Sequence, residues 1–261
     1  MKKCLCCGIL IFALLAVYGF AQTAAEQIQK GDEAYLKFDD QAALNCYLEA
    51  VKAEPGNYEA LWKASRACVD IADVIPATDK DVKARQLKMY GDGAAYGKKA
   101  VAANANDTWG HFEFSAALGK KLLLLSQKEQ VDSSKIVKAE IDKAIELDPQ
   151  NDLAYHALGR WHRRIAEIGG AKRFFGSILY GSIPKGSFQD SEKNLKKAVE
   201  LKPDYINHHL ELGLTYVSLE KYNLAAEEFH KAIDLPKTTS KDDVLKAQAQ
   251  AELAKIKTKI K

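Results

Sequence analysis

The sequence is poor in the residues that interrupt helices. Only 6 prolines and 16 glycines occur among its 261 residues, while hydrophobic residues make up 47% and charged residues 28% of the chain. These proportions exclude a collagen-like chain, a low-complexity disordered chain and a protein that crosses a membrane many times. The length allows one or two domains with a substantial hydrophobic core.

Long hydrophobic runs are also absent, except at the amino terminus. A short basic start precedes an apolar stretch over residues 4–17, and the small residues Gly19 and Ala21 follow it. This layout is typical of a secretory signal peptide. We therefore expect 1–21 to be a signal peptide and 22–261 to be an exported, periplasmic or secreted domain, through a bacterial inner membrane or, alternatively, a eukaryotic secretory route. An uncleaved anchor is the less favoured interpretation, because the stretch is at the lower length limit for a spanning helix.

The chain has no strong excess of either charge. Its 38 Lys and Arg against 35 Asp and Glu give a net charge of +3, and loss of Lys2 and Lys3 with the leader would lower this to +1. Such a balance gives no general attraction to nucleic acid or to an acidic membrane surface. We therefore expect no nucleic-acid partner.

Cysteine is scarce behind the leader. Three of the five cysteines lie within the first seven residues, which leaves Cys46 and Cys68. An oxidising compartment could join the two, but both fall in helical patterns where buried free thiols are common. We expect free thiols, with a disulfide as the less favoured alternative.

What the sequence does contain is a repeat. Five helical stretches each reach an alanine shortly before a turn, and the spacings between these alanines are 50, 44, 54 and 34 residues. The last spacing equals the tetratricopeptide period, and the others fit the same unit with insertions. Each unit must stack on its neighbours to bury its apolar face. The alanines are Ala50, Ala100, Ala144, Ala198 and Ala232.

Helical periodicity and turn residues predict an all-α fold. It is a tetratricopeptide-like right-handed α-solenoid of five helix pairs with insertions and a C-terminal capping helix. The capping helix is expected at about 240–259, where Ser240 and Asp243 resemble a capping box. The five pairs are expected at 24–37 with 40–53, 57–75 with 80–103, 107–127 with 132–147, 151–168 with 187–201, and 205–219 with 222–235.

The fourth unit carries a more specific pattern. It contains Leu158-Gly159-Arg160-Trp161, then an inserted segment, then Ile183-Pro184-Lys185-Gly186-Ser187-Phe188 and a resumed helix. This order resembles the regulator-of-microtubule-dynamics family of tetratricopeptide proteins, and residues 59–67 look like that family's first conserved helix. The resemblance implies a non-enzymatic scaffold; eukaryotic relatives are linked to microtubules, and one is an organelle tether whose repeats bind phospholipid. Because this chain begins with an export leader, we do not expect tubulin as its partner.

Motifs that carry chemistry are missing from the sequence. None of the six histidines lies in a zinc-binding pattern. The adjacent His208 and His209 point to different sides of one helix, so we expect one packed and one solvated. The glycines at 93–99 are too closely spaced for a phosphate-binding loop, and no nucleophile motif occurs. We therefore expect no metal, no cofactor and no enzyme activity.

The candidate site is the hollow of the solenoid. If Ser65, Ser115, Gly159 and Gly213 mark where the two helices of a pair touch, fixed offsets from them select the inner face. Trp and Arg are the residue types that dominate binding energy at interfaces. The selected residues are Trp62, Arg66, Trp109, Phe112, His156, Arg160, Arg163, Leu210, Leu214 and Val217.

These residues fit two functions from different classes. The first is a scaffold that binds a peptide or protein segment in the concave groove. The second is a phospholipid-binding module in which Arg160, Arg163 and Lys172 hold the headgroup. Against both stands a purely structural interpretation, since aromatics at helical spacing are more often core residues. On the first hypothesis, Arg160→Glu weakens ligand capture with little change in thermal stability.

The inserted segment 172–188 combines basic with apolar and aromatic side chains. As a basic amphipathic segment it could lie on a membrane surface or close over the groove. A short helix that packs its aromatics on the solenoid is the favoured interpretation.

Overall fold

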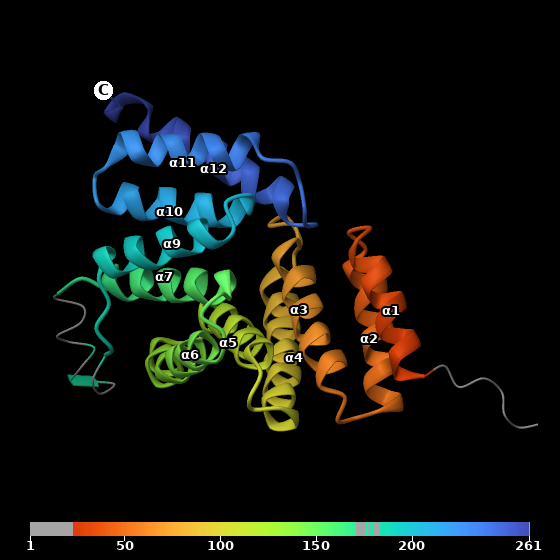
Figure 1. The fold of residues 1–261 in the computed structure, drawn as a ribbon. Coiled ribbons are helices and arrows are strands. Elements are labelled where there is room, and N and C mark those ends of the chain that lie inside the picture. Colours follow the sequence, from red (N-terminus) through yellow and green to blue (C-terminus); the bar gives the residue numbers. More distant parts are fainter. Residues whose placement is uncertain (1–22, 171–175, 177, 180–182, 261) are drawn as a thin grey trace, which may run out of the picture.

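The computed structural model describes residues 23–170, 176, 178–179 and 183–260, and no strand occurs among them. The expected leader lies outside the described residues. Figure 1 shows the helices, whose bounds are α1 (Ala24–Tyr35), α2 (Asp40–Ala53), α3 (Tyr58–Asp73), α4 (Val82–Ala103), α5 (Thr108–Leu122), α6 (Gln127–Leu147), α7 (Asp152–Ala166), α9 (Phe188–Leu201), α10 (Ile206–Ser218), α11 (Tyr222–Asp234), α12 (Asp242–Ile256) and the short 3-10 helix η1 (Lys257–Lys259).

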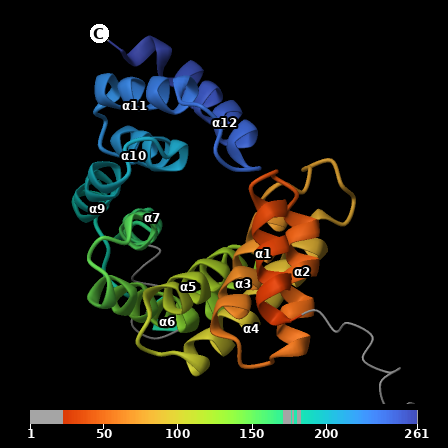
Figure 2. The same cartoon turned by 45° about the vertical axis from the view of Figure 1, so that its right-hand side comes forward.

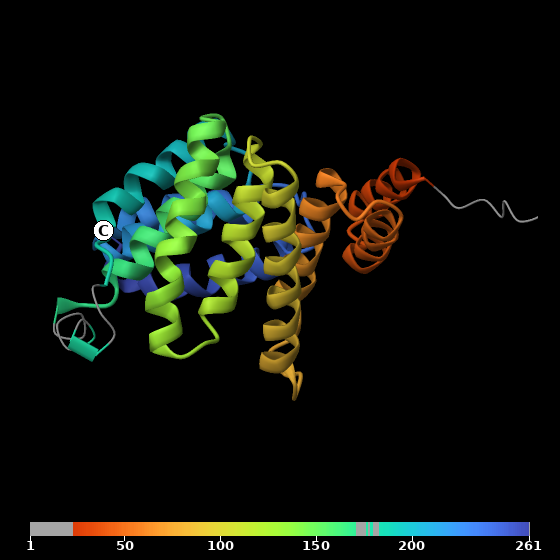
Figure 3. The same cartoon turned by 90° about the horizontal axis from the view of Figure 1, so that it is seen from below.

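Consecutive helices form five hairpins that stack along a curve. The hairpins are α1/α2, α3/α4, α5/α6, α7/α9 and α10/α11, and α12 packs on the last of them. Seen from below, the hairpins α3/α4 and α5/α6 run side by side (Figure 3). The expected tetratricopeptide-like α-solenoid with a C-terminal capping helix is therefore confirmed.

The first helices of successive hairpins contact one another. Contacts join α1 to α3, α3 to α5, α5 to α7 and α7 to α10. These helices lie toward the inside of the curve, while their partners lie outside it (Figure 2). We call the surface formed by α1, α3, α5, α7 and α10 the inner wall.

Hairpins close through a small residue opposite a large one. A Cβ atom added at Gly213 on α10 would lie 2.5 Å from Cε1 of Phe229 on α11. The same atom added at Gly159 on α7 would lie 2.5 Å from Cγ of Leu195 on α9. No side chain fits at that distance, so glycine is required at both positions, and the large partner fills the space that glycine leaves.

Polar residues fix where the helices begin. Asn57 and Asn151 each accept a hydrogen bond from the backbone N–H three residues later, at 3.0 Å, and cap α3 and α7. Helix α6 begins at Gln127, five residues before the expected 132, because Ser126 and Glu129 form a capping box. The connection expected at 128–131 therefore lies within α6, and the chain instead connects the two helices over residues 123–126.

The expected capping box at Ser240 and Asp243 is wrong. Helix α12 begins at Asp242, whose carboxylate accepts hydrogen bonds from the backbone N–H groups of Thr238 and Thr239 at 2.7 and 2.8 Å. The Ser240 hydroxyl instead donates to the Asp40 carboxylate on α2. The Ser240 side chain therefore bonds to Asp40, a residue distant in the sequence, and does not cap the helix as the local pattern predicted.

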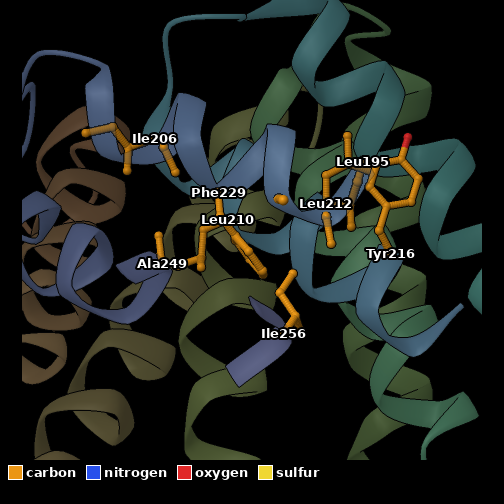
Figure 4. Packing of buried hydrophobic residues seen from close by; sticks show 11 residues of the cluster. Leu195, Ile206, Leu210, Leu212, Tyr216, Phe229, Ala249 and Ile256 are labelled. Carbon is orange, nitrogen blue, oxygen red and sulfur yellow. The ribbon is translucent and has the colours of Figure 1, made fainter. Parts of the chain in front are cut away.

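Helix α12 covers the end of the solenoid, as terminal repeats require. Its residues Ala249 and Ile256 are 0% and 3% exposed and pack against Leu210 and Phe229 in the largest apolar cluster (Figure 4). Without α12 the outer faces of α10 and α11 would meet water.

The curve brings the segment before α12 back to the first hairpins. Lys241 Nζ lies 2.6 Å from Asp70 Oδ1 and 4.0 Å from Asp73 Oδ2, both on α3. Together with the Ser240–Asp40 bond, this contact joins sequence positions about 170 to 200 residues apart. The two ends of the solenoid therefore contact each other at α2 and α3.

Several smaller expectations can be placed on the described residues. Cys46 and Cys68 are both free, and burial raises the pKa of the Cys68 thiol to about 12. Of the inserted segment, Ile178 and Leu179 are exposed, while its basic and aromatic residues Lys172, Arg173, Phe174, Phe175 and Tyr180 lie outside the described part. No described helix has both the length and the apolar character that a membrane span requires.

Candidate functional site

The sequence-selected residues lie on four helices of the inner wall. Trp62 and Arg66 are on α3, and Trp109 and Phe112 are on α5. The remaining six lie on the other two helices: His156, Arg160 and Arg163 on α7, and Leu210, Leu214 and Val217 on α10. Because α3 contacts α5 and α7 contacts α10, the ten residues form two groups.

Aromatic side chains dominate the first group. The rings of Trp62 and Trp109 stack with centroids 5.3 Å apart and an interplanar angle of 20°, and Phe112 meets Trp109 edge-on at 6.2 Å. Both indoles are half-buried, whereas Phe112 is buried. The guanidinium of Arg66 lies 3.8 Å from the centroid of Tyr35 and 5.1 Å from that of Trp62. Stacked indoles beside a guanidinium are a surface of the kind that anchors binding partners.

Ion pairs dominate the second group. Arg160 Nε lies 2.8 Å from Glu211 Oε1, and Arg163 bonds the other oxygen of Glu211 and also Glu167 at 2.9 Å. Burial acts to raise the pKa of the Glu211 carboxyl, but Arg160 and Arg163 outweigh burial and hold it below its ordinary value. Both arginines are therefore already neutralised within the fold. The expectation that Arg160→Glu leaves stability nearly unchanged is not compatible with this pairing.

The neighbouring histidines are packed rather than solvated. His208 Nδ1 lies 3.0 Å from His156 Nδ1, and His208 Nε2 lies 2.8 Å from Asp152 Oδ2. His209 Nδ1 lies 2.6 Å from Glu228 Oε2, and His209 Nε2 lies 2.7 Å from a backbone oxygen. The expectation of one packed and one solvated histidine was wrong, because α10 is covered by α7 on one side and by α11 on the other.

One histidine arrangement recurs in two hairpins. His111 on α5 lies 2.5 Å from Glu140 on α6, and its other ring nitrogen lies 3.1 Å from the backbone oxygen six residues earlier. His209 makes the same two contacts, with Glu228 on α11 and with the backbone oxygen of Pro203. Both histidines precede their small residue by four positions, so they join the two helices of a hairpin and are structural.

The apolar members of the second group belong to the core. Leu210 is 1% exposed and lies inside the cluster of Figure 4, while Leu214 and Val217 are half-buried and pack against that cluster. For Leu210 the structural interpretation therefore holds.

Sequence reasoning missed the acidic side of the inner wall. Asp73 accepts hydrogen bonds from Lys120 at 2.8 Å and from the Tyr90 hydroxyl at 2.6 Å, and Asp70 forms the ion pair with Lys241. No local pattern brings Lys241 to Asp70, since only the curvature of the stack does so. Glu113 on α5 was missed as well, although it occupies the same repeat position as Glu211.

The described residues show no metal site. No group of three or more His, Cys, Asp or Glu side chains is arranged to hold an ion in the part of the chain that the structure covers. What the inner wall offers chemically is aromatic surface and fixed charge.

Comparison with solved structures agrees with this architecture. A thermophilic TPR protein of Thermus thermophilus superposes with a TM-score of 0.62 at 18% identity, covering 88% of this chain and 99% of the other. At that identity the likeness shows the fold alone.

Comparison of sequences identifies the family. The bovine regulator of microtubule dynamics protein 1 is 26% identical over 197 residues, which is 75% of this chain and 61% of the bovine protein. The mouse protein of the same name is 24% identical over 240 residues, covering 92% of this chain and 77% of the mouse protein. The family described as regulator of microtubule dynamics protein 1-3 matches residues 27–257. This chain therefore belongs to the regulator of microtubule dynamics family, as its L-G-R-W motif and inserted fourth hairpin indicated.

Proposed function

We propose that the protein is a non-enzymatic interaction scaffold that binds a segment of a partner polypeptide along the inner wall. The observation that carries the proposal is the stacked pair Trp62 and Trp109, half-buried between α3 and α5 beside Arg66. Large aromatic side chains with a neighbouring guanidinium supply most of the binding energy at protein interfaces. The fold supports the same class of function, since solenoids offer extended concave binding surfaces.

The charges of the inner wall favour a polypeptide over a phospholipid. The lipid alternative assigns the headgroup to Arg160, Arg163 and Lys172. Both guanidiniums are paired with Glu211, and Lys172 lies outside the described residues. Further along the inner wall, Asp70 is paired with Lys241 and Asp73 with Lys120. Burying an acyl chain beside so many ionised groups costs free energy, whereas a peptide can pair with them.

We propose further that the protein acts after export. The support is the basic start and apolar stretch of residues 2–17, followed by Gly19 and Ala21. Mass spectrometry of the amino-terminal peptide from the native host would test this: a peptide beginning at Gln22 supports cleavage and export, and one that retains the leader contradicts cleavage.

Site-specific photocrosslinking tests the proposed function. Benzoylphenylalanine in place of Trp109 on the inner wall, and in place of the exposed Ala95 on α4 as a control, is irradiated in the native host. The crosslinked partner fragment is identified by mass spectrometry and synthesised, and its affinity for the wild type and for Trp109→Ala is measured by calorimetry.

We expect crosslinks to one polypeptide segment at position 109 and none at position 95. Trp109→Ala should weaken binding of the synthetic segment by about thirtyfold, since a central tryptophan contributes about 2 kcal/mol or more. Stoichiometric phospholipid in organic extracts, with no peptide crosslinked at position 109, would contradict the proposal and favour the lipid alternative.

A further inference from the structure

The inner helices carry acidic and basic residues at equivalent repeat positions. Counted from the small residue of each inner helix, Arg66 and Arg160 follow by one position, and Glu113 and Glu211 precede by two. An arginine of one hairpin is thereby set to meet a glutamate of the next. The small residues are Ser65, Ser115, Gly159 and Gly213.

The arginine–glutamate pair forms between α7 and α10 but not between α3 and α5. Between α7 and α10, Glu211 is neutralised by Arg160 and Arg163. Between α3 and α5, Arg66 lies over Tyr35 instead. The repeat position that Arg163 occupies on α7 is Val69 on α3 and supplies no charge.

Glu113 is therefore left as a buried carboxyl group that forms no ion pair with any of the described residues, although Arg66 and Lys241 lie near enough to act on it electrostatically. Its residue is 3% exposed, and within the described part of the chain no hydrogen bond or ion pair reaches its side chain. Burial raises the pKa of Glu113 to about 8, against the lowering influence of Arg66 and Lys241, while Asp70 raises it further. Unpaired buried polar groups of this kind are rare in folded proteins and call for a partner.

The surroundings of Glu113 suit a cation. Trp109 lies one helical turn before Glu113 on α5 and stacks on Trp62. A carboxylate and an aromatic side chain one helical turn apart can together recognise an ammonium or guanidinium group.

The chain itself provides a precedent on the same wall. Lys241, from the connection between α11 and α12, enters the hollow and pairs with Asp70 at 2.6 Å, one helical turn beyond Arg66 on α3. The inner wall therefore already binds one lysine, Lys241, that projects from a non-helical segment of the chain.

We infer that Glu113 is the receptor for a lysine or arginine side chain of the partner polypeptide, which enters between α3 and α5 beside Trp109. This inference rests on the proposed function and specifies the partner: a segment with a basic residue flanked by groups that pack on the indoles. The arriving cation converts Glu113 from its protonated to its ionised form, so one proton leaves for the solvent as the ion pair forms.

Peptide pools of defined chemistry test the inference. The full chain is immobilised and offered four pools of synthetic heptapeptides whose central residue is Lys, Arg, norleucine or Glu and whose other positions are randomised. We expect the wild type to retain the Lys and Arg pools about tenfold over the norleucine pool, and Glu113→Gln to lose that preference. Glu211→Gln, a substitution at the same repeat position, is the matched control. At temperatures below the melting temperature of this variant, it should keep the preference for the Lys and Arg pools.

Proton release gives a readout that a structural role would not produce. The best-retained peptide is titrated at pH 7 in two buffers of different ionisation enthalpy. The wild type should release close to one proton per peptide bound, and Glu113→Gln none. A melting temperature measured without peptide completes the comparison: Glu113→Gln should melt no lower than the wild type, because the substitution breaks no pair.

The outcomes separate this inference from the proposed function. Retention without regard to the central residue, or an unchanged preference in Glu113→Gln, overturns the inference and leaves peptide binding standing. A melting temperature lowered in Glu113→Gln as far as in Glu211→Gln means that Glu113 already has a partner, which also overturns it. If no pool is retained, both fall. Binding to vesicles of phosphatidylethanolamine that depends on Glu113 would assign the carboxylate to a lipid ammonium and contradict the polypeptide partner.

Discussion

Two interfaces of the inner wall, α3 with α5 and α7 with α10, carry an arginine and a glutamate at the same repeat positions but differ in whether the two residues pair. In the second, Arg160 and Arg163 neutralise Glu211. In the first, Arg66 lies over Tyr35, and the buried Glu113 forms no ion pair with any residue that the structure describes. An arginine and a glutamate at fixed repeat offsets therefore do not by themselves indicate a structural pair, because the guanidinium can lie against neighbouring rings, as Arg66 does against Tyr35 and Trp62.

The largest effect is expected from breaking the closed interface. Glu211→Gln leaves Arg163, which is 5% exposed, as a buried charge without its main counterion. Removing one partner of a buried pair costs about 3–5 kcal/mol in the free energy of unfolding. Urea denaturation of this variant beside Glu113→Gln measures the contrast, and equal losses in the two would show that the interfaces do not differ.

A reversed charge at Arg160 should have the next largest effect. Arg160→Glu places a second carboxylate beside Glu211 and removes a charged contact, so we expect a loss of about 2 kcal/mol in the free energy of unfolding. Thermal denaturation checks this against Arg164→Glu, a change of the same kind at an exposed position on α7. A melting temperature like that of the wild type would restore Arg160 as a residue free to bind ligand.

The contact that joins the two ends of the solenoid should have a smaller effect. Lys241→Met removes the ion pair with Asp70 and should cost about 1.5 kcal/mol, at the lower end of the range for hydrogen bonds to charged groups. Hydrogen exchange in residues 236–241 should accelerate. Lys237→Met is the matched control, because its surface pair with Asp243 should contribute well under 1 kcal/mol. Similar exchange in both variants would exclude Lys241 as the contact that holds the ends together.

Acidification should give the smallest effect, with opposite signs at the two interfaces. Burial and the neighbouring His208 lower the pKa of His156, and burial lowers the pKa of His208 despite its hydrogen bond to Asp152. A histidine with a lowered folded-state pKa stabilises the fold above the unfolded value of about 6.5 and loses that contribution as the pH falls below it. The α7 and α10 interface should therefore loosen between about pH 6.5 and pH 5.

The α3 and α5 interface should respond in the other direction. Because the folded-state pKa of Glu113 is raised to about 8, the folded protein binds this proton more tightly than the unfolded chain does. Its stability contribution therefore grows as the pH falls from about 8 toward the unfolded value near 4.3. Native-state hydrogen exchange, corrected for intrinsic rates, measures both helix pairs in one experiment. Protection that changes in the same direction in both would contradict the assigned charge states.

The inner wall shows how far sequence patterns can place a site. The register counted from the small residues put Trp62, Trp109 and Phe112 together, because equivalent positions on stacked hairpins must meet. The same register could not tell that Leu210 is core or that Arg160 and Arg163 are paired, since burial and partner choice depend on the neighbouring helix. The equivalence with Glu211 could have identified Glu113 as a residue of the inner wall. It could not have shown that Glu113 forms no ion pair in the described part of the chain.

Local sequence patterns were sufficient to predict the helical hairpins, their number and the family. Period, small-against-large contacts and helix caps act within about 50 residues along the chain, and each is readable where it occurs. Which charges meet across the hollow depends on how the hairpins stack in three dimensions. Lys241 reaches Asp70 because the curvature of five stacked hairpins adds up over the whole chain, and no local pattern encodes that sum.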